Sequence, residues 1–285
     1  MKIEQVTEDR LDLIWAVCLD PSVDKETRDL MENGMEERIR WIKDMILKGL
    51  GILIASEKPR EEKIHYKWVG SMLHSELAIH GQVNMGLLEY VPIENALEPI
   101  DGKNSLFINC MWVLPPFWQM GVGTALLETL IEKAKQHGGA SVIVYDGDRW
   151  FGTSIKYMPL SFFKKFGFKE VDRDGSRILL NLDLGSSSVP KLITPKLKEF
   201  QKNKKINLEL FYSNQCPWSK YMINTIKKGI ETYSTINLKI HNTDDPKFVK
   251  ELGISKGIYL NGKPIIKRMA SWEEIKVAID KINKN

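Results

Sequence analysis

Apolar and polar residues along the first two thirds of the chain recur at spacings that predict a mixture of strands and helices. Short apolar runs predict strands at residues 51–56, 67–74, 84–91, 105–113 and 140–145. An amphipathic run predicts a helix at residues 36–49, closed by a glycine. A second helix is predicted around residues 158–167, where a proline opens it and Gly167 ends it before a strand at Phe168.

The clearest helix signal lies between the last two of these predicted strands. One buried face is predicted by the spacing of Leu126, Leu127, Leu130, Ile131 and Ala134, with Gly138 standing where a C-terminal cap belongs. The order is a helix, several antiparallel strands, then strand, helix, strand, helix and strand. This order predicts an α+β layout with one strong strand-to-helix crossover.

A different pattern follows in the last third of the chain. Strands are predicted at residues 206–212, 236–241 and 257–266, with helices after Pro217, near residues 245–253 and at residues 271–282. Ser271 and Glu274 form a capping box at the start of the last helix. These elements predict a small second domain of the α/β class.

Residues 184–195, "LGSSSVPKLITP", have the serines, glycine and prolines of a linker. We therefore expect domains at residues 1–184 and 196–285, joined by a linker at residues 185–195. Residues 185–285 hold 19 Lys and Arg against 9 Asp and Glu, which leaves 22 against 28 before them and gives net charges of +10 and −6. Opposite charges favour docking of the two domains, and the dispersed lysines argue against a nucleic-acid partner.

Composition limits the class of protein further. The chain has 285 residues, of which 43% are hydrophobic, and no apolar run long enough to span a membrane. Its N-terminus is too acidic and polar for a signal peptide, so we expect a cytoplasmic protein without a membrane partner. The three cysteines lie far apart and match no zinc spacing, so we expect neither a disulfide framework nor a metal site.

The segment "PPFWQMGVGTALL" places a G-x-G turn between a buried strand and a helix. Unpaired amides of the first helical turn and the helix dipole bind phosphate together, and glycine lets the phosphate come close. The sequence satisfies neither the dinucleotide fingerprint nor the P-loop. Judged by spacing alone, the G-x-G turn can be either a phosphate site or a plain tight turn.

The stretch "CMWVLPPFWQMGVGTALLETLIEKAKQHG", followed by a buried strand and "FFKKFGFKEVD", resembles the acetyl-CoA-binding core of the GNAT superfamily of N-acetyltransferases. The resemblance covers residues 1–184 and implies acetyl-CoA as co-substrate. It implies that backbone groups of Met111, Trp112 and Val113 pair with the pantetheine arm. It also implies a pyrophosphate site at the amides of Gln119, Met120, Gly121, Val122, Gly123 and Thr124, with Trp112, Phe117 and Trp118 as walls of the cofactor tunnel.

Two positions depart from the family pattern. Trp118 stands where Arg or Gln is usual, and Phe163 stands where many members have the tyrosine that protonates the departing thiolate. Phenylalanine has no proton to donate, so Tyr157 and Tyr145 are the candidate donors. Both also suit plain packing.

Acyl transfer to an amine also needs a base for the amine and a donor that polarises the carbonyl. Glu89, at the end of an apolar strand, is the candidate base. Asp146 is the alternative, although it and Asp148 equally suit a surface turn. The Val113 amide is the candidate for polarising the carbonyl.

The C-terminal part resembles a thioredoxin or glutaredoxin fold, with "CPWS" where those proteins have C-x-x-C or C-x-x-S. Cys216 at a helix N-terminus is expected to have a lowered pKa, because the dipole favours the thiolate. Ser219 replaces the second cysteine and the usual proline before the "NGK" strand is absent, which leaves single-thiol chemistry or an inactive adaptor. The two parts together resemble the YoaP-type bacterial acetyltransferases.

The sequence therefore predicts an N-acetyltransferase that moves an acetyl group from acetyl-CoA to a small-molecule or peptide amine by direct attack. Two alternatives stay open. One is a thiol module for redox or soft-metal chemistry centred on Cys216, with acyl-CoA as a regulator, and the other is a non-catalytic acyl-CoA sensor. The acceptor is not specified by the sequence, and a homodimer is compatible with it.

Overall fold

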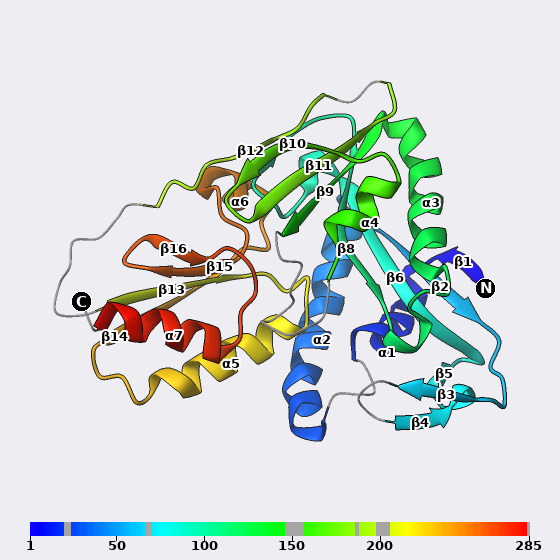
Figure 1. Cartoon of the computed structure of the whole chain (residues 1–285), viewed down its shortest axis with the longest axis horizontal. Helices are drawn as coiled ribbons and strands as arrows, with labels where there is room; N and C mark the ends of the chain where they lie inside the picture. The colour runs from blue at the N-terminus through cyan, green and yellow to red at the C-terminus, as the bar shows by residue number, and fades with distance from the viewer. Residues whose placement is uncertain (20–23, 67–69, 146–156, 186–187, 198–205, 284–285) are drawn as a thin grey trace.

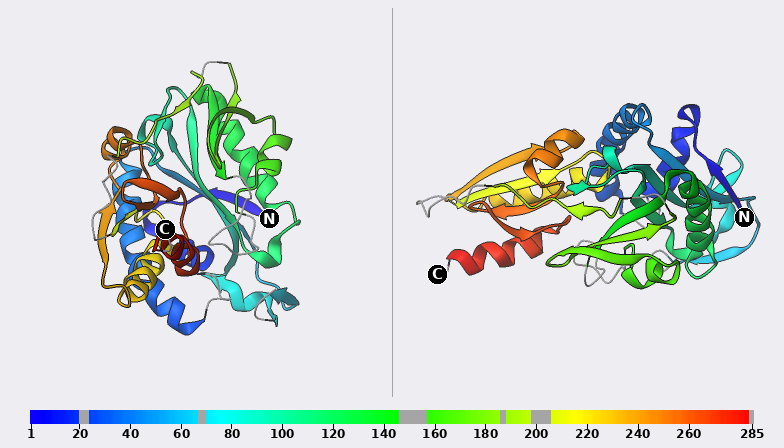
Figure 2. Two further views of the ribbon diagram at one scale, coloured as in Figure 1. Left: turned by 60° about the vertical axis from the view of Figure 1, so that its left-hand side comes forward. Right: turned by 90° about the horizontal axis from the view of Figure 1, so that it is seen from above.

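The computed structural model describes residues 1–19, 24–66, 70–145, 157–185, 188–197 and 206–283. Most of its strands form one large and one small sheet, which lie side by side along the long axis (Figure 1), and two further pairs of described strands form separate two-stranded sheets. The chain termini lie at opposite ends of the molecule, as the view from above also shows (Figure 2). The N-terminal part contains the large sheet and the C-terminal part contains the small one.

The large sheet has the order β1-β2-β6-β8-β9-β11-β10, with β5 paired to β6 beside this path. Neighbouring strands are antiparallel except β8 and β9, which are parallel. The predicted strands at 51–56, 84–91, 105–113 and 140–145 are confirmed. The bounds are β1 (Lys2–Gln5), β2 (Gly51–Glu57), β5 (Ala78–Ile79), β6 (Gln82–Pro92), β8 (Leu106–Val113), β9 (Gly139–Tyr145), β10 (Lys169–Asp174) and β11 (Arg177–Asp183).

Helices cover both faces of the large sheet. The helices α3 (Val122–Ala134) and α4 (Leu160–Lys165) pack into one apolar core, and α1 (Trp15–Cys18) and α2 (Lys25–Ile46) pack into the other. The predicted apolar face of α3 and the left-handed cap at Gly138 are confirmed. The predicted start of the helix at residue 36 is wrong, because Asp24 caps α2 by accepting a hydrogen bond from the Thr27 N–H.

Short 3-10 turns connect several of these elements. They are η1 (Glu8–Ile14), η2 (His74–Leu77), η3 (Ile93–Asn95), η4 (Pro115–Phe117) and η5 (Lys135–His137). A separate hairpin forms from β3 (Lys63–Tyr66) and β4 (Gly70–Leu73). The sequence pattern predicts one strand at residues 67–74 and misses β3, since both strands are short and polar.

The small sheet has the order β14-β13-β15-β16, in which β13 and β14 are parallel and the other neighbours are antiparallel. Instead of one strand at residues 257–266 the structure has a hairpin, because Asn261 and Gly262 both adopt positive φ angles in the turn. The capping box of Ser271 and Glu274 is confirmed. The bounds are β13 (Ile206–Tyr212), α5 (Trp218–Ile230), β14 (Ile236–Asn242), α6 (Pro246–Leu252), β15 (Gly257–Leu260), β16 (Lys263–Ile266) and α7 (Trp272–Asn283).

The predicted linker is partly built into the fold. Within residues 185–195, β12 (Lys191–Leu192) pairs antiparallel with β7 (Ile100–Asp101). The Leu192 N–H also donates to a carboxylate oxygen of Asp172, 2.8 Å away. This half of the segment is therefore held against the N-terminal part.

Three ion pairs among the described residues connect the two parts, and in each of them the C-terminal part contributes the cation. Lysines of the C-terminal part meet acids of the N-terminal part in the pairs Lys220–Glu37 at 2.8 Å, Lys256–Glu98 at 2.6 Å and Lys267–Asp174 at 2.5 Å. This polarity agrees with the opposite net charges of the two parts. Packing is tight where α2 meets the start of α5, because a Cβ atom at Gly34 would lie 2.6 Å from the Pro217 carbonyl oxygen.

Candidate active site

Near the centre of the large sheet, β8 and β9 separate from one another. They are the only parallel neighbours among the described strands of this sheet. Pairing between β8 and β9 covers only Leu106–Ile108 opposite Ala140–Val142. Both strands continue beyond this point, to Val113 and Tyr145. The last five residues of β8 therefore present one backbone edge that β9 does not cover.

A β-bulge lies where the strands separate. Opposite β6, Glu89 pairs with Cys110 and Tyr90 pairs with Ile108, so Asn109 is the extra residue. Beyond the bulge, the Leu114 N–H bonds to the Met85 carbonyl on the β6 side. Because backbone groups alternate along a strand, those of Val113 and Met111 face the open edge.

The same alternation corrects one predicted contact. Trp112 lies opposite Leu87 and directs its backbone toward β6. Its side chain contacts two other rings, with centroids 6.2 Å from Trp118 and 6.3 Å from Tyr157. Trp112 can therefore act on a ligand at this edge only through its ring.

The glycine loop, residues 114–121, connects the end of β8 to the start of α3. Gly121, the N-cap of α3, has a φ of 80°, which only glycine adopts without strain. A Cβ atom there would meet nothing within 4 Å, whereas one at Gly123 would lie 3.0 Å from the Met111 side chain. The first-turn amides of Val122, Gly123 and Thr124 have no acceptor within the helix, so this end of α3 can bind an anion.

Trp118, in the position where Arg or Gln is usual, binds the chain's own strand. Its indole N–H donates to the Val113 carbonyl oxygen over 2.7 Å. Gln119 follows with a φ of 64°, and Met120 is 54% exposed. Trp118 therefore holds the loop against the end of β8, leaving the Val113 N–H as the donor at this end of the edge.

The glycine-capped helix α3 and the separated strands β8 and β9 lie within a segment that matches a known protein family. The model of the Acetyltransferase (GNAT) family matches residues 52–158. Residues 52–158 carry a GNAT acetyltransferase domain. The co-substrate of this enzyme class is acetyl-CoA.

Individual relatives and solved structures share little sequence identity with this chain. The chain is 26% identical over 210 residues to the "Uncharacterized N-acetyltransferase YoaP" of Bacillus subtilis (strain 168), which covers 71% of this chain and 72% of that protein. Among solved structures, it is similar to the PaiA N-acetyltransferase of Thermoplasma acidophilum in complex with coenzyme A. That match has 16% identity, covers 64% of this chain and 99% of the other, and has a TM-score of 0.38. The ribosomal-protein-S18-alanine N-acetyltransferase of Escherichia coli matches at 13% identity, over 66% and 96% of the two chains, with a TM-score of 0.34.

In α4, just beyond the matched residues, Phe163 is a core residue. Its ring is completely buried in α4 and makes edge-to-face contacts with Phe162 and Phe168. Phe162, not Phe163, is the aromatic ring of α4 that a Cβ atom at Gly123 would meet. Phe163 thus contributes packing, and the proton donor must come from elsewhere.

The two candidate tyrosines have different surroundings. The Tyr157 hydroxyl donates to Cys110 Sγ over 3.2 Å, which places it beside β8 and next to Trp112. Burial raises its pKa well above the usual value, so Tyr157 keeps its proton at neutral pH. Tyr145 is the last residue of β9, and burial raises its pKa to about 12. Its hydroxyl is buried without a hydrogen-bond partner among the described residues.

Glu89, the candidate base, is completely buried and both of its oxygens are engaged. Oε1 forms an ion pair with Arg38, which is 2% exposed. Oε2 accepts a hydrogen bond from Gln215 Nε2 over 3.3 Å, and the same Gln215 nitrogen donates to the Asn109 carbonyl oxygen over 3.1 Å. Gln215 therefore connects the buried carboxylate to the bulge at the open edge. Asp146, the alternative base, and Asp148 lie outside the described residues.

Sequence reasoning misses Arg38 and Gln215. Arg38 has a signal in the pattern, since it falls among the buried positions Met31, Met35, Ile42 and Met45 of α2, where a charge needs a partner. Gln215 has none beyond its place next to Cys216. It belongs to this site only because the start of α5 docks against α2.

The expectation of a thiolate at Cys216 is wrong. Burial is the largest effect and raises the pKa of this thiol, outweighing the opposite effects of Arg38 and the Trp218 N–H. Burial likewise raises the pKa of Cys110, and that of Cys18 to about 12. The helix N-terminus is present as predicted, but desolvation of the partly buried sulfur disfavours its charged form.

This correction predicts slow alkylation of Cys216. At pH 7 the folded protein should react with iodoacetamide more slowly than the urea-unfolded chain, since a raised pKa leaves less thiolate than the usual value of ~8.5 does. The rate in the folded state should keep rising at pH values where the unfolded chain has levelled off. Peptide mass spectrometry, with Cys216→Ser as the blank, measures both. Faster reaction at pH 7 in the folded state would contradict the assignment.

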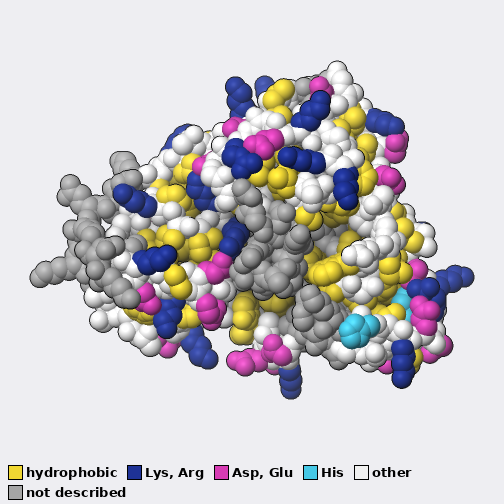
Figure 3. Space-filling view, in the orientation of Figure 1, with side chains coloured by type: hydrophobic (Ala, Val, Ile, Leu, Met, Phe, Trp, Pro, Cys, Tyr) yellow, Lys and Arg dark blue, Asp and Glu magenta, His cyan; other side chains and the backbone are white. Residues whose placement is uncertain are grey.

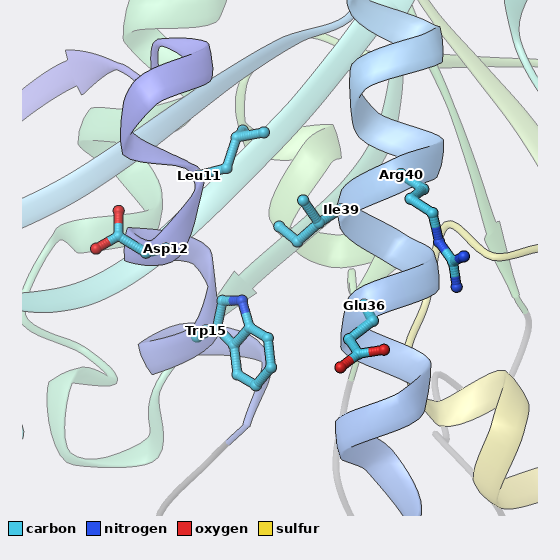
Figure 4. Close-up of a pocket in the computed structure, with 6 residues that line it drawn as sticks. All are labelled: Leu11, Asp12, Trp15, Glu36, Ile39 and Arg40. Carbon is cyan, nitrogen blue, oxygen red and sulfur yellow. The ribbon is translucent and has the colours of Figure 1, made fainter.

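Three further observations concern the rest of the molecule. A pocket of about 490 Å³ lies between η1–α1 and α2, where Leu11 and Ile39 face one another and Arg40 extends away (Figure 4). Its lining, Leu11, Asp12, Trp15, Glu36, Ile39 and Arg40, contains none of the predicted site residues. Lys and Arg side chains are scattered over the face in Figure 3 and form no single basic patch there. Among the described residues, no helix is both long and apolar enough to cross a lipid bilayer.

Proposed function

We propose that the protein transfers the acetyl group of acetyl-CoA to an amine by direct attack, with both substrates bound together. The observation that carries this proposal is the continuity of the open β8 edge with the glycine-capped end of α3. A pantetheine-sized arm can pair with Met111 and Val113 while the amides of residues 119–124 hold phosphate. When bound, acetyl-CoA supplies an activated thioester.

The chain's own groups have distinct roles in this proposal. The Met111 N–H faces the open edge next to the bulge and polarises the acetyl carbonyl, as an oxyanion-hole donor does. The predicted donor, the Val113 N–H, lies at the phosphate end of the edge and pairs with the pantetheine arm. Tyr157 is favoured over Tyr145 as the proton donor, because its hydroxyl lies beside Cys110 on β8. Glu89 is the base, and the bridge through Gln215 supports this role by keeping its carboxylate next to the open edge.

The acceptor is proposed to be a small-molecule or peptide amine. The net charge of −6 in the N-terminal part favours a cationic acceptor. The names of the matched proteins agree with amine acetylation as the reaction class, and none of them supplies the acceptor of this chain.

For residues 196–285 we propose a thioredoxin-like domain that acts as a docked adaptor. Two strand–helix units, a hairpin and a last helix follow one another in the order expected from that resemblance. The raised pKa of Cys216 argues against the alternative of a thiol module. Domain limits at residues 184 and 196 are part of this proposal.

A panel of amines, with acetyl-CoA as donor and free thiol as readout, tests the reaction. Tyr157→Phe should lower kcat at least 10²-fold, as is typical for loss of a general acid. Tyr145→Phe is the matched control and should leave kcat unchanged, because its hydroxyl has no hydrogen bond to lose among the described residues. Cys216→Ser should retain turnover.

Two outcomes would contradict this assignment. Equal loss in both tyrosine variants would remove Tyr157 as the proton donor. Binding of acetyl-CoA without thiol release for any amine would favour a non-catalytic acyl-CoA sensor instead.

A further inference from the structure

The open edge of β8 is closed at one end by the C-terminal part. The edge runs from Val113, beside the glycine loop, back to Asn109 at the bulge. At Asn109 the carbonyl oxygen is already bound by Gln215 Nε2, 3.1 Å away. The part of the edge that a ligand can use therefore ends between Met111 and Asn109.

The direction of a bound acyl-CoA follows from the same geometry. Its phosphates belong at the N-terminus of α3, which follows the Val113 end of β8. An arm that pairs with the open edge must then extend toward Asn109, over about 13 Å for four residues of strand. The acyl group is at the far end of that arm, and Gln215 lies at the end of its path.

Gln215 is held firmly in this position. Its side chain is 9% exposed and bonds to both Asn109 and Glu89, and Glu89 is fixed by Arg38. Two residues later, Pro217 packs against the backbone of α2 at Gly34. A longer acyl chain would have to break two hydrogen bonds or displace this docked segment.

We propose that Gln215 determines acyl-chain length in this enzyme. It closes the end of the β8 edge, so that a short acyl group fits and a longer one does not. The inference rests on the proposed acyltransferase function and adds that the C-terminal part forms a wall of the acyl site.

The test compares acetyl-CoA, butyryl-CoA and hexanoyl-CoA with the full-length protein, in calorimetric binding and in steady-state turnover. In Gln215→Ala, the butyryl-to-acetyl ratio of affinities and of kcat/KM should rise about tenfold or more, the usual scale for a changed apolar contact in a specificity site. Gln215→Met should keep the acetyl preference, because it fills the same space without the hydrogen bonds. Lys250→Ala removes a different contact between the two parts, the 2.7 Å bond to the Glu94 carbonyl, and should leave the ratio unchanged.

The outcomes separate this inference from the function it rests on. An unchanged chain-length ratio in Gln215→Ala, with acetyl-CoA still bound, would overturn the role of Gln215 alone. An equal rise in Lys250→Ala would also overturn it, because loosened docking would then be the cause. Absence of acyl-CoA binding in the wild type would instead remove the proposed function.

Discussion

Replacing Gly121 with glutamate should abolish acetyl-CoA binding, as measured by calorimetric titration of the folded protein. Two effects add at this position. A side chain at a φ of 80° introduces backbone strain of about 1–3 kcal/mol. A carboxylate beside the first-turn amides also repels the pyrophosphate that those amides would hold.

Two variants separate the strain from the charge. Gly175→Glu adds the same side chain at a φ of 62°, likewise with nothing within 4 Å, in the turn between β10 and β11. It should keep wild-type affinity. Gly121→Ala carries the strain without the charge and should weaken binding less than glutamate does. Full affinity in Gly121→Glu would exclude a pyrophosphate at this loop.

Replacing Arg38 with methionine should destabilise the protein more than any other single change considered. Glu89 would remain completely buried without its cation, and breaking such a pair typically costs about 3–5 kcal/mol. Urea unfolding followed by tryptophan fluorescence measures the loss. Activity should fall as well, because the carboxylate would lose the partner that orients it.

The double variant Arg38→Met with Glu89→Gln is the matched control. It removes both charges, and neutral replacement of a buried pair costs far less than loss of one partner. Most of the lost stability should return, whereas activity should not, since glutamine is no base. A single variant as stable as the wild type would show that water or another cation reaches Glu89.

The parts of the site that the sequence predicts are those formed by neighbouring residues. The apolar face of α3, the cap at Gly121 and the buried strand before them depend on local spacing and backbone conformation. The separation of β8 from β9 has no such signal, because it depends on where pairing stops between residues that are 34 positions apart in the chain.

The parts that were missed depend on docking. Asp24 extends α2 by more than two turns beyond its amphipathic core, and this brings Gly34 against Pro217. Cys216, partly buried, lies next to that contact, and desolvation raises its pKa although its place at a helix start predicts the opposite. The local sequence shows that Cys216 lies at a helix start, where the dipole lowers the pKa of a thiol. It does not show the desolvation, which has the larger effect on this pKa.

The Gln215 bridge bears on how this chain can be divided. Glu89 and Asn109 belong to the N-terminal part, and both complete their hydrogen bonding with a side chain from beyond residue 205. A fragment that ends at the linker would admit water to the buried carboxylate and lengthen the open edge of β8. Under the proposed function, the C-terminal part is then a component of the catalytic cleft, and we expect the smallest active enzyme to include both sheets.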